Sequence, residues 1–276
     1  MRVFFKSVLI LTLLLGLGAC KREAGVSAGA GKGDTPPATV EPAEPVALTE
    51  LKDVIETTDS YLIGISFAPV VNKYPGLAQA VGAYADAARA ELMEAVAGLG
   101  NDKPSAPYEL SLNFEQVLDS PQLVAVSADG SRYTGGAHGQ PLVHRFVWLP
   151  VQQRMLTAEA LVPRPESWGP IAAYVREQLY TAASVRADAD ELTPQERLQF
   201  VRNAGKMVDG GAGADVANFS QFQPVVGADG KLTALRFVFP PYQVGPYVDG
   251  TQTVDVPAAV LLPHVAPEYA SLFARP

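Results

Sequence analysis

The chain has 276 residues, 48% of them hydrophobic and 18% charged, with a formal net charge of −8. This length and apolar content suffice for an ordinary hydrophobic core, and the single cysteine excludes a disulfide within the chain. The acidic balance argues against nucleic-acid binding, which needs a basic surface, and favours either solubility or a basic partner.

Residues 1–19 resemble the signal peptide of a bacterial lipoprotein. Arg2 and Lys6 precede an apolar run that is too short to span a bilayer as a mature helix. The run ends in the letters LGAC, which resemble a lipobox, so we expect lipidation of Cys20. The alternative is a signal peptide that ends near a cysteine by chance. Because Lys21 follows Cys20 in place of an aspartate, the pattern favours the outer membrane.

The segment after the cysteine has the composition of a flexible tether. Residues 21–47 contain mostly Gly, Ala, Pro, Lys and Glu and almost no large apolar side chains, so they cannot offset the entropy of ordering. We expect residues 20–47 to connect a lipid anchor to a fold that faces the periplasm. Removal of residues 1–19 takes away two positive charges and changes the net charge from −8 to −10.

A small N-terminal α/β subdomain is expected over residues 48–105. Alternating apolar residues predict a strand within residues 60–70. A helix is predicted over residues 77–99, because apolar side chains recur there at steps of three and four. We interpret this apolar stripe as part of the core.

Strands dominate the next part of the chain. The pattern predicts strands at residues 108–120, 123–127 and 142–150, with a turn at the letters ADG, residues 128–130. A returning strand is expected within residues 151–156.

Helices and then strands complete the chain. A short turn-and-helix segment is predicted at residues 156–163. A helix follows at residues 167–180 with Ser167 as its cap, and a further helix starts with Thr193 as cap and Pro194 at its first position. A hairpin at residues 227–231 follows. Two further strands are predicted at residues 232–240 and 252–256. This order indicates an α+β fold.

Two glycine-rich motifs carry aromatic side chains. The first has the pattern Tyr-x-Gly-Gly-Ala-His and precedes a strand; the second has the pattern Pro-Tyr-x-x-Gly-Pro-Tyr-x-x-Gly and follows an aromatic strand. Their residues are as follows: Tyr133, Gly135, Gly136, Ala137, His138, Pro241, Tyr242, Gly245, Pro246, Tyr247 and Gly250. Together they resemble the extracytoplasmic domain of unknown general function that is shared by the anti-sigma factor RsiV and the peptidoglycan deacetylase PdaC. The resemblance covers about residues 105–270, so we expect this domain at residues 106–276.

The resemblance implies a twisted antiparallel sheet packed by helices. It also implies binding at the cell envelope, because RsiV senses lysozyme and the deacetylase chemistry of PdaC lies in a separate domain. We therefore expect a non-enzymatic lipoprotein that binds a protein partner, a lysozyme-like hydrolase being the most specific candidate. A module that binds peptidoglycan fragments and an envelope hydrolase are the alternatives.

His138 has two readings. One is a metal site shared with His144, which would need further ligands from elsewhere. The other, which we favour, is a turn whose glycines adopt positive φ while the imidazole bonds nearby backbone. We expect no metal and no cofactor.

The candidate binding residues are Tyr133, His138, Tyr242, Tyr247 and Asp249. Tyr242 and Tyr247 belong to a proline- and glycine-rich crossing that follows the strand at residues 232–240. Their rings are either presented at the surface or packed into the core beneath this crossing, and Asp249 is expected in a turn. We expect no enzymatic activity, since the chain has no Gly-x-Ser-x-Gly elbow. The letters GGAGAD, residues 210–215, lack the lysine of a phosphate-binding loop.

Overall fold

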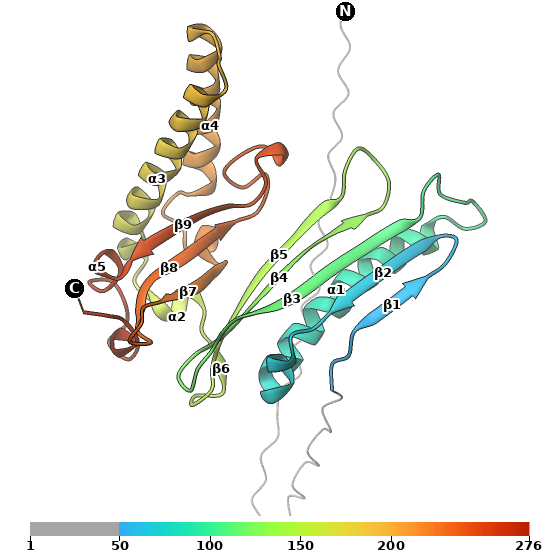
Figure 1. Ribbon diagram of the computed structural model, residues 1–276, viewed down its shortest axis with the longest axis horizontal. Coiled ribbons are helices and arrows are strands. Elements are labelled where there is room, and N and C mark those ends of the chain that lie inside the picture. The colour runs from blue at the N-terminus through green and yellow to red at the C-terminus, as the bar shows by residue number, and fades with distance from the viewer. Residues whose placement is uncertain (1–49, 276) are drawn as a thin grey trace, which may run out of the picture. The chain divides into compact units, whose positions relative to one another are not determined.

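The computed structural model describes residues 50–275, which belong to one compact unit that begins at Ala47. The described chain forms a six-stranded sheet, a three-stranded sheet and helices that pack against both (Figure 1). The predicted α+β class is confirmed. The expected signal peptide, the lipidated Cys20 and the tether up to residue 47 lie outside the described residues.

The first sheet contains six strands in sequence order. Its strands are as follows: β1 (Val54–Thr57), β2 (Tyr61–Ser66), β3 (Tyr108–Asp119), β4 (Val124–Tyr133), β5 (Gln140–Leu149) and β6 (Arg154–Met155). Neighbours are antiparallel except β2 and β3, which are parallel. The parallel pair arises because helix α1 (Pro75–Gly98) connects the two strands, and a parallel pair needs such a crossover.

This sheet crosses the subdomain boundary that we placed between residues 105 and 106. Strand β2 pairs with β3 along six residues, from Tyr61 with Tyr108 to Ser66 with Asn113. A two-stranded hairpin is marginal by itself. The N-terminal strands and α1 therefore share a sheet and a core with the strands that follow.

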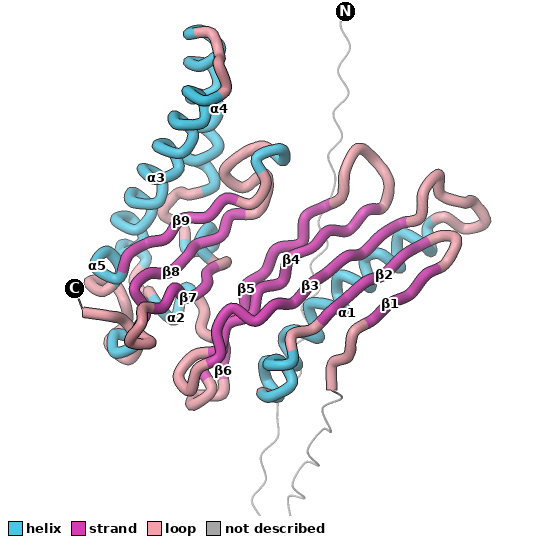
Figure 2. Tube along the Cα trace, viewed as in Figure 1, coloured by secondary structure: helices cyan, strands magenta, loops and turns pink. Residues whose placement is uncertain are grey.

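Helix α1 covers one face of the six-stranded sheet (Figure 2). The predicted apolar stripe is confirmed, since Leu77, Val81 and Leu92 are fully buried against the even-numbered side chains of β3. The β3 side chains in this core are Leu110, Leu112 and Phe114.

The predicted turn at residues 128–130 is wrong, because these residues lie inside β4. Gly130 is needed there for close backbone approach. A Cβ atom on it would lie 2.0 Å from the carbonyl oxygen of Ser111. The chain turns instead between Tyr133 and Gln140, within the first motif.

The second sheet is antiparallel, in the order β7 (Phe222–Val226), β8 (Leu232–Phe239) and β9 (Gln252–Pro257). The predicted hairpin at residues 227–231 is confirmed by the bond from the Gly230 N–H to the Gly227 carbonyl, 3.0 Å long. Four helices accompany this sheet: α2 (Ala158–Leu161), α3 (Trp168–Ala189), α4 (Pro194–Gly211) and α5 (Ala258–Leu261). The 3₁₀ turns are η1 (Pro69–Lys73), η2 (Pro165–Ser167), η3 (Val216–Phe219), η4 (Tyr247–Asp249) and η5 (Ala270–Leu272).

The two long helices differ in how they start. Thr193 and Glu196 form a capping box at α4, as its sequence predicts. Ser167 precedes α3 but makes no capping bond, because η2 leads directly into the helix and leaves Ser167 with helical dihedral angles. Helix α3 continues nine residues past its predicted end at residue 180, as far as Ala189.

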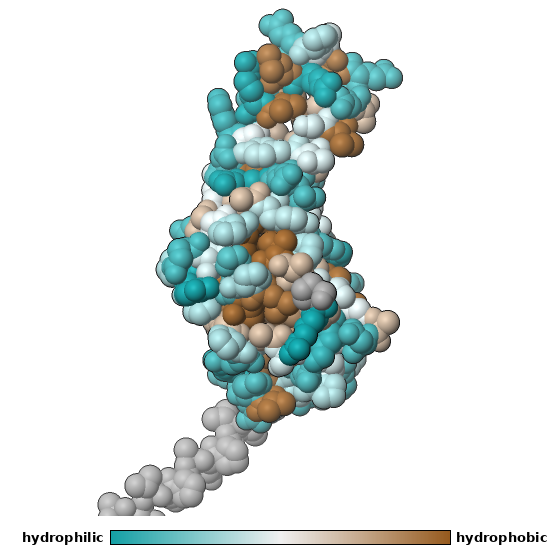
Figure 3. All heavy atoms as spheres, turned by 90° about the vertical axis from the view of Figure 1, so that its left-hand side faces the viewer, coloured by the Kyte–Doolittle hydropathy of each residue, from teal (hydrophilic) through white to brown (hydrophobic). Residues whose placement is uncertain are grey.

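Helices α3 and α4 form a hairpin that projects beyond the second sheet (Figure 1). Figure 3 shows hydrophobic side chains on this projecting part, where Val185 is 63% exposed and Leu198 55% exposed. No helix among residues 50–275 is long and apolar enough to cross a membrane.

A second core joins the two sheets. It contains the buried face of α3, including Trp168, aromatic side chains of η3 and β8, including Phe219 and Phe237, and apolar side chains of the first sheet. These first-sheet residues are Leu123, Ala125, Val147 and Leu149. One end of β4 and β5 is therefore buried on both faces, which explains the unbroken buried run in β4. Both cores are built within residues 63–273.

Candidate functional site

The two motifs meet in space although 104 residues separate them. The Tyr242 hydroxyl lies 2.8 Å from His138 Nε2. The His138 ring stacks on Tyr247, with centroids 4.0 Å apart and planes inclined by 15°. We call His138, Tyr242 and Tyr247 the aromatic cluster. It links the loop between β4 and β5 to the crossing between β8 and β9.

His138 behaves largely as the turn hypothesis predicts. Gly135 and Gly136 both have φ of 97°, and His138 Nδ1 lies 3.1 Å from the carbonyl oxygen of Gly139. Both ring nitrogens of His138 are therefore engaged, Nδ1 by the Gly139 carbonyl and Nε2 by the Tyr242 hydroxyl. The contacts to the two tyrosines were not predicted.

The tyrosine rings lie at the surface. Tyr242 is 52% exposed, Tyr247 37% and the neighbouring Val248 83%. The alternative, in which these rings close the core, is therefore not observed. Exposed rings with a polar hydroxyl suit stacking and hydrogen bonding to a partner.

A rigid frame holds the cluster in place. Tyr242 has φ of 76°, an uncommon value for a residue other than glycine, and its N–H donates to the Gly245 carbonyl, 2.9 Å away. The Gln243 amide donates to the carbonyls of Gly211 and Asn218, both at 2.9 Å. Val244 is buried beneath the crossing. The sequence motif contains Gln243 but does not reveal this anchoring role.

Two further predicted binding residues make contacts at the two motif-bearing loops. Asp249 has a side chain only 12% exposed and accepts a bond of 2.5 Å from Arg186 in α3. This hydrogen bond raises the pKa of Arg186 above its ordinary value. The Tyr133 hydroxyl donates to the Gly136 carbonyl at 3.3 Å. No sequence pattern pointed to Arg186, since its partner is 63 residues away.

The histidines do not assemble into a metal site. His138 precedes β5, so the strand periodicity that would align it with His144 does not apply. His144 stacks on Tyr84 of α1, with centroids 4.9 Å apart, and His264 follows α5. Across residues 50–275 no group of three or more His, Cys, Asp or Glu is placed to hold a metal ion.

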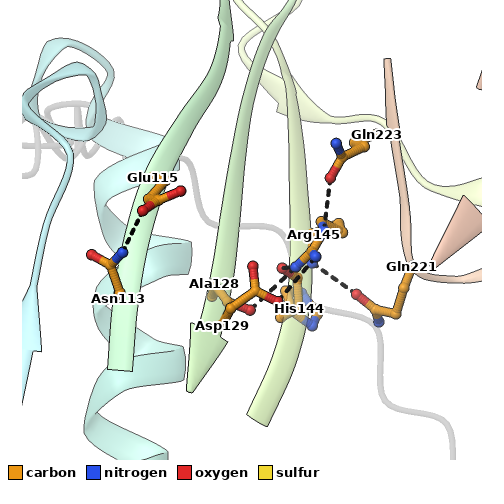
Figure 4. A network of polar contacts seen from close by, with 8 residues as sticks. All are labelled: Asn113, Glu115, Ala128, Asp129, His144, Arg145, Gln221 and Gln223. Carbon is orange, nitrogen blue, oxygen red and sulfur yellow. Dashed lines mark hydrogen bonds and ion pairs between the residues drawn. The ribbon is translucent and has the colours of Figure 1, made fainter. Parts of the chain in front are cut away.

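A polar network beside His144 ties the first sheet to the second (Figure 4). The Arg145 guanidinium donates to Gln223 at 2.9 Å and to Asp129 at 3.0 Å. The Arg145 backbone N–H donates to Gln221 at 2.8 Å. Since Gln221 and Gln223 come from β7 and the residue before it, this network holds β5 against the second sheet.

The fold and site define an α+β protein whose two motif-bearing loops form one exposed aromatic cluster. Residues 54–140, which include His138, match the family described as Deacetylase PdaC. Residues 164–259, which include Tyr242 and Tyr247, match the family described as Protein of unknown function (DUF3298). Two parts of the chain are therefore similar to the PdaC and DUF3298 families, in agreement with the resemblance to PdaC that the motifs suggested, and the first match starts earlier than residue 105.

Two solved structures are similar to this chain. A DUF3298 family protein from Pseudomonas aeruginosa PAO1 is 18% identical, with 80% of this chain and 91% of that chain covered and a TM-score of 0.49. A DUF3298 family member from Bacteroides fragilis NCTC 9343 is 17% identical, with 79% and 92% covered and a TM-score of 0.48. No curated protein matches the sequence.

Substitution of two neighbouring glycines at the end of α4 tests how the crossing between β8 and β9 packs against this helix. A Cβ atom on Gly211 would lie 1.8 Å from the Gln243 carbonyl oxygen, whereas one on Gly210 would meet nothing within 4 Å. We expect Gly211→Ala to lower the free energy of unfolding by about 2 kcal/mol and Gly210→Ala to raise it by up to about 1 kcal/mol. Chemical denaturation measures both, and equal effects of the two substitutions would contradict this packing.

Proposed function

We propose that this protein is a non-enzymatic lipoprotein whose aromatic cluster binds a protein partner. The observation that carries this proposal is that both sequence motifs contribute to one exposed cluster, in which the side chains of Tyr242 and Tyr247 both contact His138 and lie beside each other. Exposed aromatic side chains on a rigid support are the residues that dominate protein interfaces. In this proposal Cys20 carries the lipid and anchors the chain to the outer membrane, facing the periplasm.

The partner that we propose is a lysozyme-like peptidoglycan hydrolase. Two observations support it: the motifs resemble those of RsiV, which senses lysozyme, and the acidic net charge, −8 for the whole chain and −10 without residues 1–19, complements a basic enzyme. Binding of this kind would serve inhibition, sensing or immunity against a toxin.

A second candidate is a module that binds peptidoglycan fragments. The observation in its favour is the pair of neighbouring rings of Tyr242 and Tyr247, whose centroids are 5.7 Å apart and which are both exposed. Flat aromatic faces can stack on sugar rings as well as on protein side chains.

Capture of hen lysozyme by immobilised residues 48–276 tests the proposal. We expect saturable binding that survives moderate salt. Tyr247→Ala should weaken it by at least about 30-fold, the effect of removing an interface anchor. Ile55→Ala serves as the control, because Ile55 is 86% exposed on β1 and outside the cluster.

The other outcomes separate the alternatives. Absence of capture from both hen lysozyme and a periplasmic extract would overturn the hydrolase-binding proposal. Binding of soluble glycan fragments that Tyr247→Ala abolishes would establish the second candidate. Digestion of cell-wall sacculi by the purified protein would show instead that it is an envelope hydrolase.

His138→Ala is expected to reduce stability by about 1 kcal/mol, because it removes one hydrogen bond and one ring stack at the surface. His264→Ala, outside the cluster, is the control. Thermal unfolding of both variants measures the effect. An unchanged melting temperature together with lost partner binding would show that His138 contacts the partner and is not a structural pin.

A further inference from the structure

A cavity of about 540 Å³ lies where α1, β5, α2 and the residues before β7 meet. Its volume falls in the range of small-molecule sites. The apolar lining residues are Ala80, Ala83, Phe146, Met155, Leu156 and Ala158. The cavity is lined by none of the residues of the aromatic cluster, so it is separate from the proposed partner site.

Two polar side chains on the cavity wall have unused hydrogen-bonding groups. His144 and Tyr84 stack on one another, and both line the cavity. Within residues 50–275 neither the His144 ring nitrogens nor the Tyr84 hydroxyl bonds to another protein group, and none of these atoms is fully enclosed, so a molecule in the cavity can reach them. Unpaired polar groups beside an apolar space are favourable only when water or a ligand satisfies them.

The charges around the cavity disfavour an ionic ligand. Arg145 also lines the cavity, but its donors already bond to Gln223, Asp129 and backbone carbonyls. Its positive charge opposes a cation, while the exposed carboxylate of Glu159 opposes an anion. Burial, with the nearby Arg145 as a second cause, lowers the pKa of His144 to about 4, so its imidazole is neutral and offers one donor and one acceptor.

We propose that this cavity binds a small uncharged organic molecule with an apolar or aromatic body and one hydroxyl or amide group that pairs with His144. The apolar walls cover the body of the molecule, and His144 selects the polar group. Such a combination of apolar walls and a few directed polar groups is how small-molecule sites achieve specificity.

Methionine methyl NMR provides a direct test with p-cresol as the probe. Residues 48–276 contain three methionines, Met93, Met155 and Met207, and of these Met155 lines the cavity. We expect p-cresol to shift the Met155 methyl signal saturably, while the signals of Met93 and Met207 stay in place. Toluene, which lacks the hydroxyl group, should bind about fivefold more weakly.

Two variants distinguish binding of the probe in the cavity from non-specific binding. His144→Phe keeps an aromatic ring and should reduce p-cresol affinity about fivefold to the level of toluene. Ala83→Trp should block both probes, because Ala83 is an exposed residue on the cavity wall; Ala90→Trp, exposed further along α1, should not. The proposal is overturned if Met155 does not respond, if all three methionines respond alike, or if Ala83→Trp binds p-cresol as the wild type does.

Discussion

Gly130→Ala is expected to lower the free energy of unfolding by about 3 kcal/mol, whereas Gly64→Ala should leave it unchanged or raise it slightly. Both glycines lie in the interior of strands of the same sheet. They differ in what surrounds them. A Cβ atom on Gly130 would lie 2.0 Å from Ser111 O and 2.9 Å from Leu112 Cα, while one on Gly64 would meet nothing within 4 Å.

The size of this effect follows from the rigidity of the neighbours. The atoms near Gly130 belong to the backbone of β3, which pairs with β4 from Glu109 to Asp119. They cannot move aside as a flexible side chain would. Relief of the clash therefore requires separating two central strands.

Urea denaturation of residues 48–276 measures the two variants against the wild type. The prediction is a large drop of the midpoint for Gly130→Ala and none for Gly64→Ala, with equal denaturant slopes. If both midpoints fell equally, the cause would be a general intolerance of β-strands in this sheet to alanine, and the close approach of β4 to β3 would be refuted.

The wild type is expected to lose about 3 kcal/mol of stability between pH 7 and pH 4 that the His144→Phe variant does not lose. The pKa of His144 is lowered from 6.5 to about 4, first by burial and second by the charge of Arg145. The unfolded chain thus binds the proton more readily than the folded chain. The stability that the neutral imidazole of His144 contributes is complete above pH 6.5 and is lost as the pH falls toward 4.

Three groups around His144 bear on this prediction. Tyr84 stacks on the imidazole, Arg145 is its chain neighbour, and Glu159 lines the same cavity. Tyr84→Phe keeps the stacked ring and His144, so it serves as the control and should retain the wild-type pH dependence. Denaturation curves at pH 7, 5.5 and 4 give the difference, and parallel losses in the wild type and His144→Phe would contradict it.

Local patterns in the sequence determined much of this fold. The apolar stripe of residues 77–99, the alternation within residues 108–120, the capping box at Thr193 and the hairpin at residues 227–231 all depend on neighbours within a few positions. Such features are set by chain geometry and local hydrogen bonding. The paired motifs likewise suggested the resemblance to PdaC, which the match of residues 54–140 to the PdaC family confirms.

The tertiary structure alone decided the features that depend on residues far apart in the chain. The letters ADG signal a turn locally, yet Gly130 lies inside β4, paired with β3, whose backbone leaves no room there for a side chain. The strand at residues 60–70 was predicted, but its parallel pairing with β3 was not.

The candidate site shows the same division. The sequence singled out His138, Tyr242 and Tyr247, but their contact spans 104 residues, and the ion pair of Arg186 with Asp249 spans 63. No local pattern encodes which distant side chains meet, because that depends on how the second core packs the two sheets together. The sequence by itself therefore determined which residues form the motifs, and the packing of the two sheets determined that they form one surface.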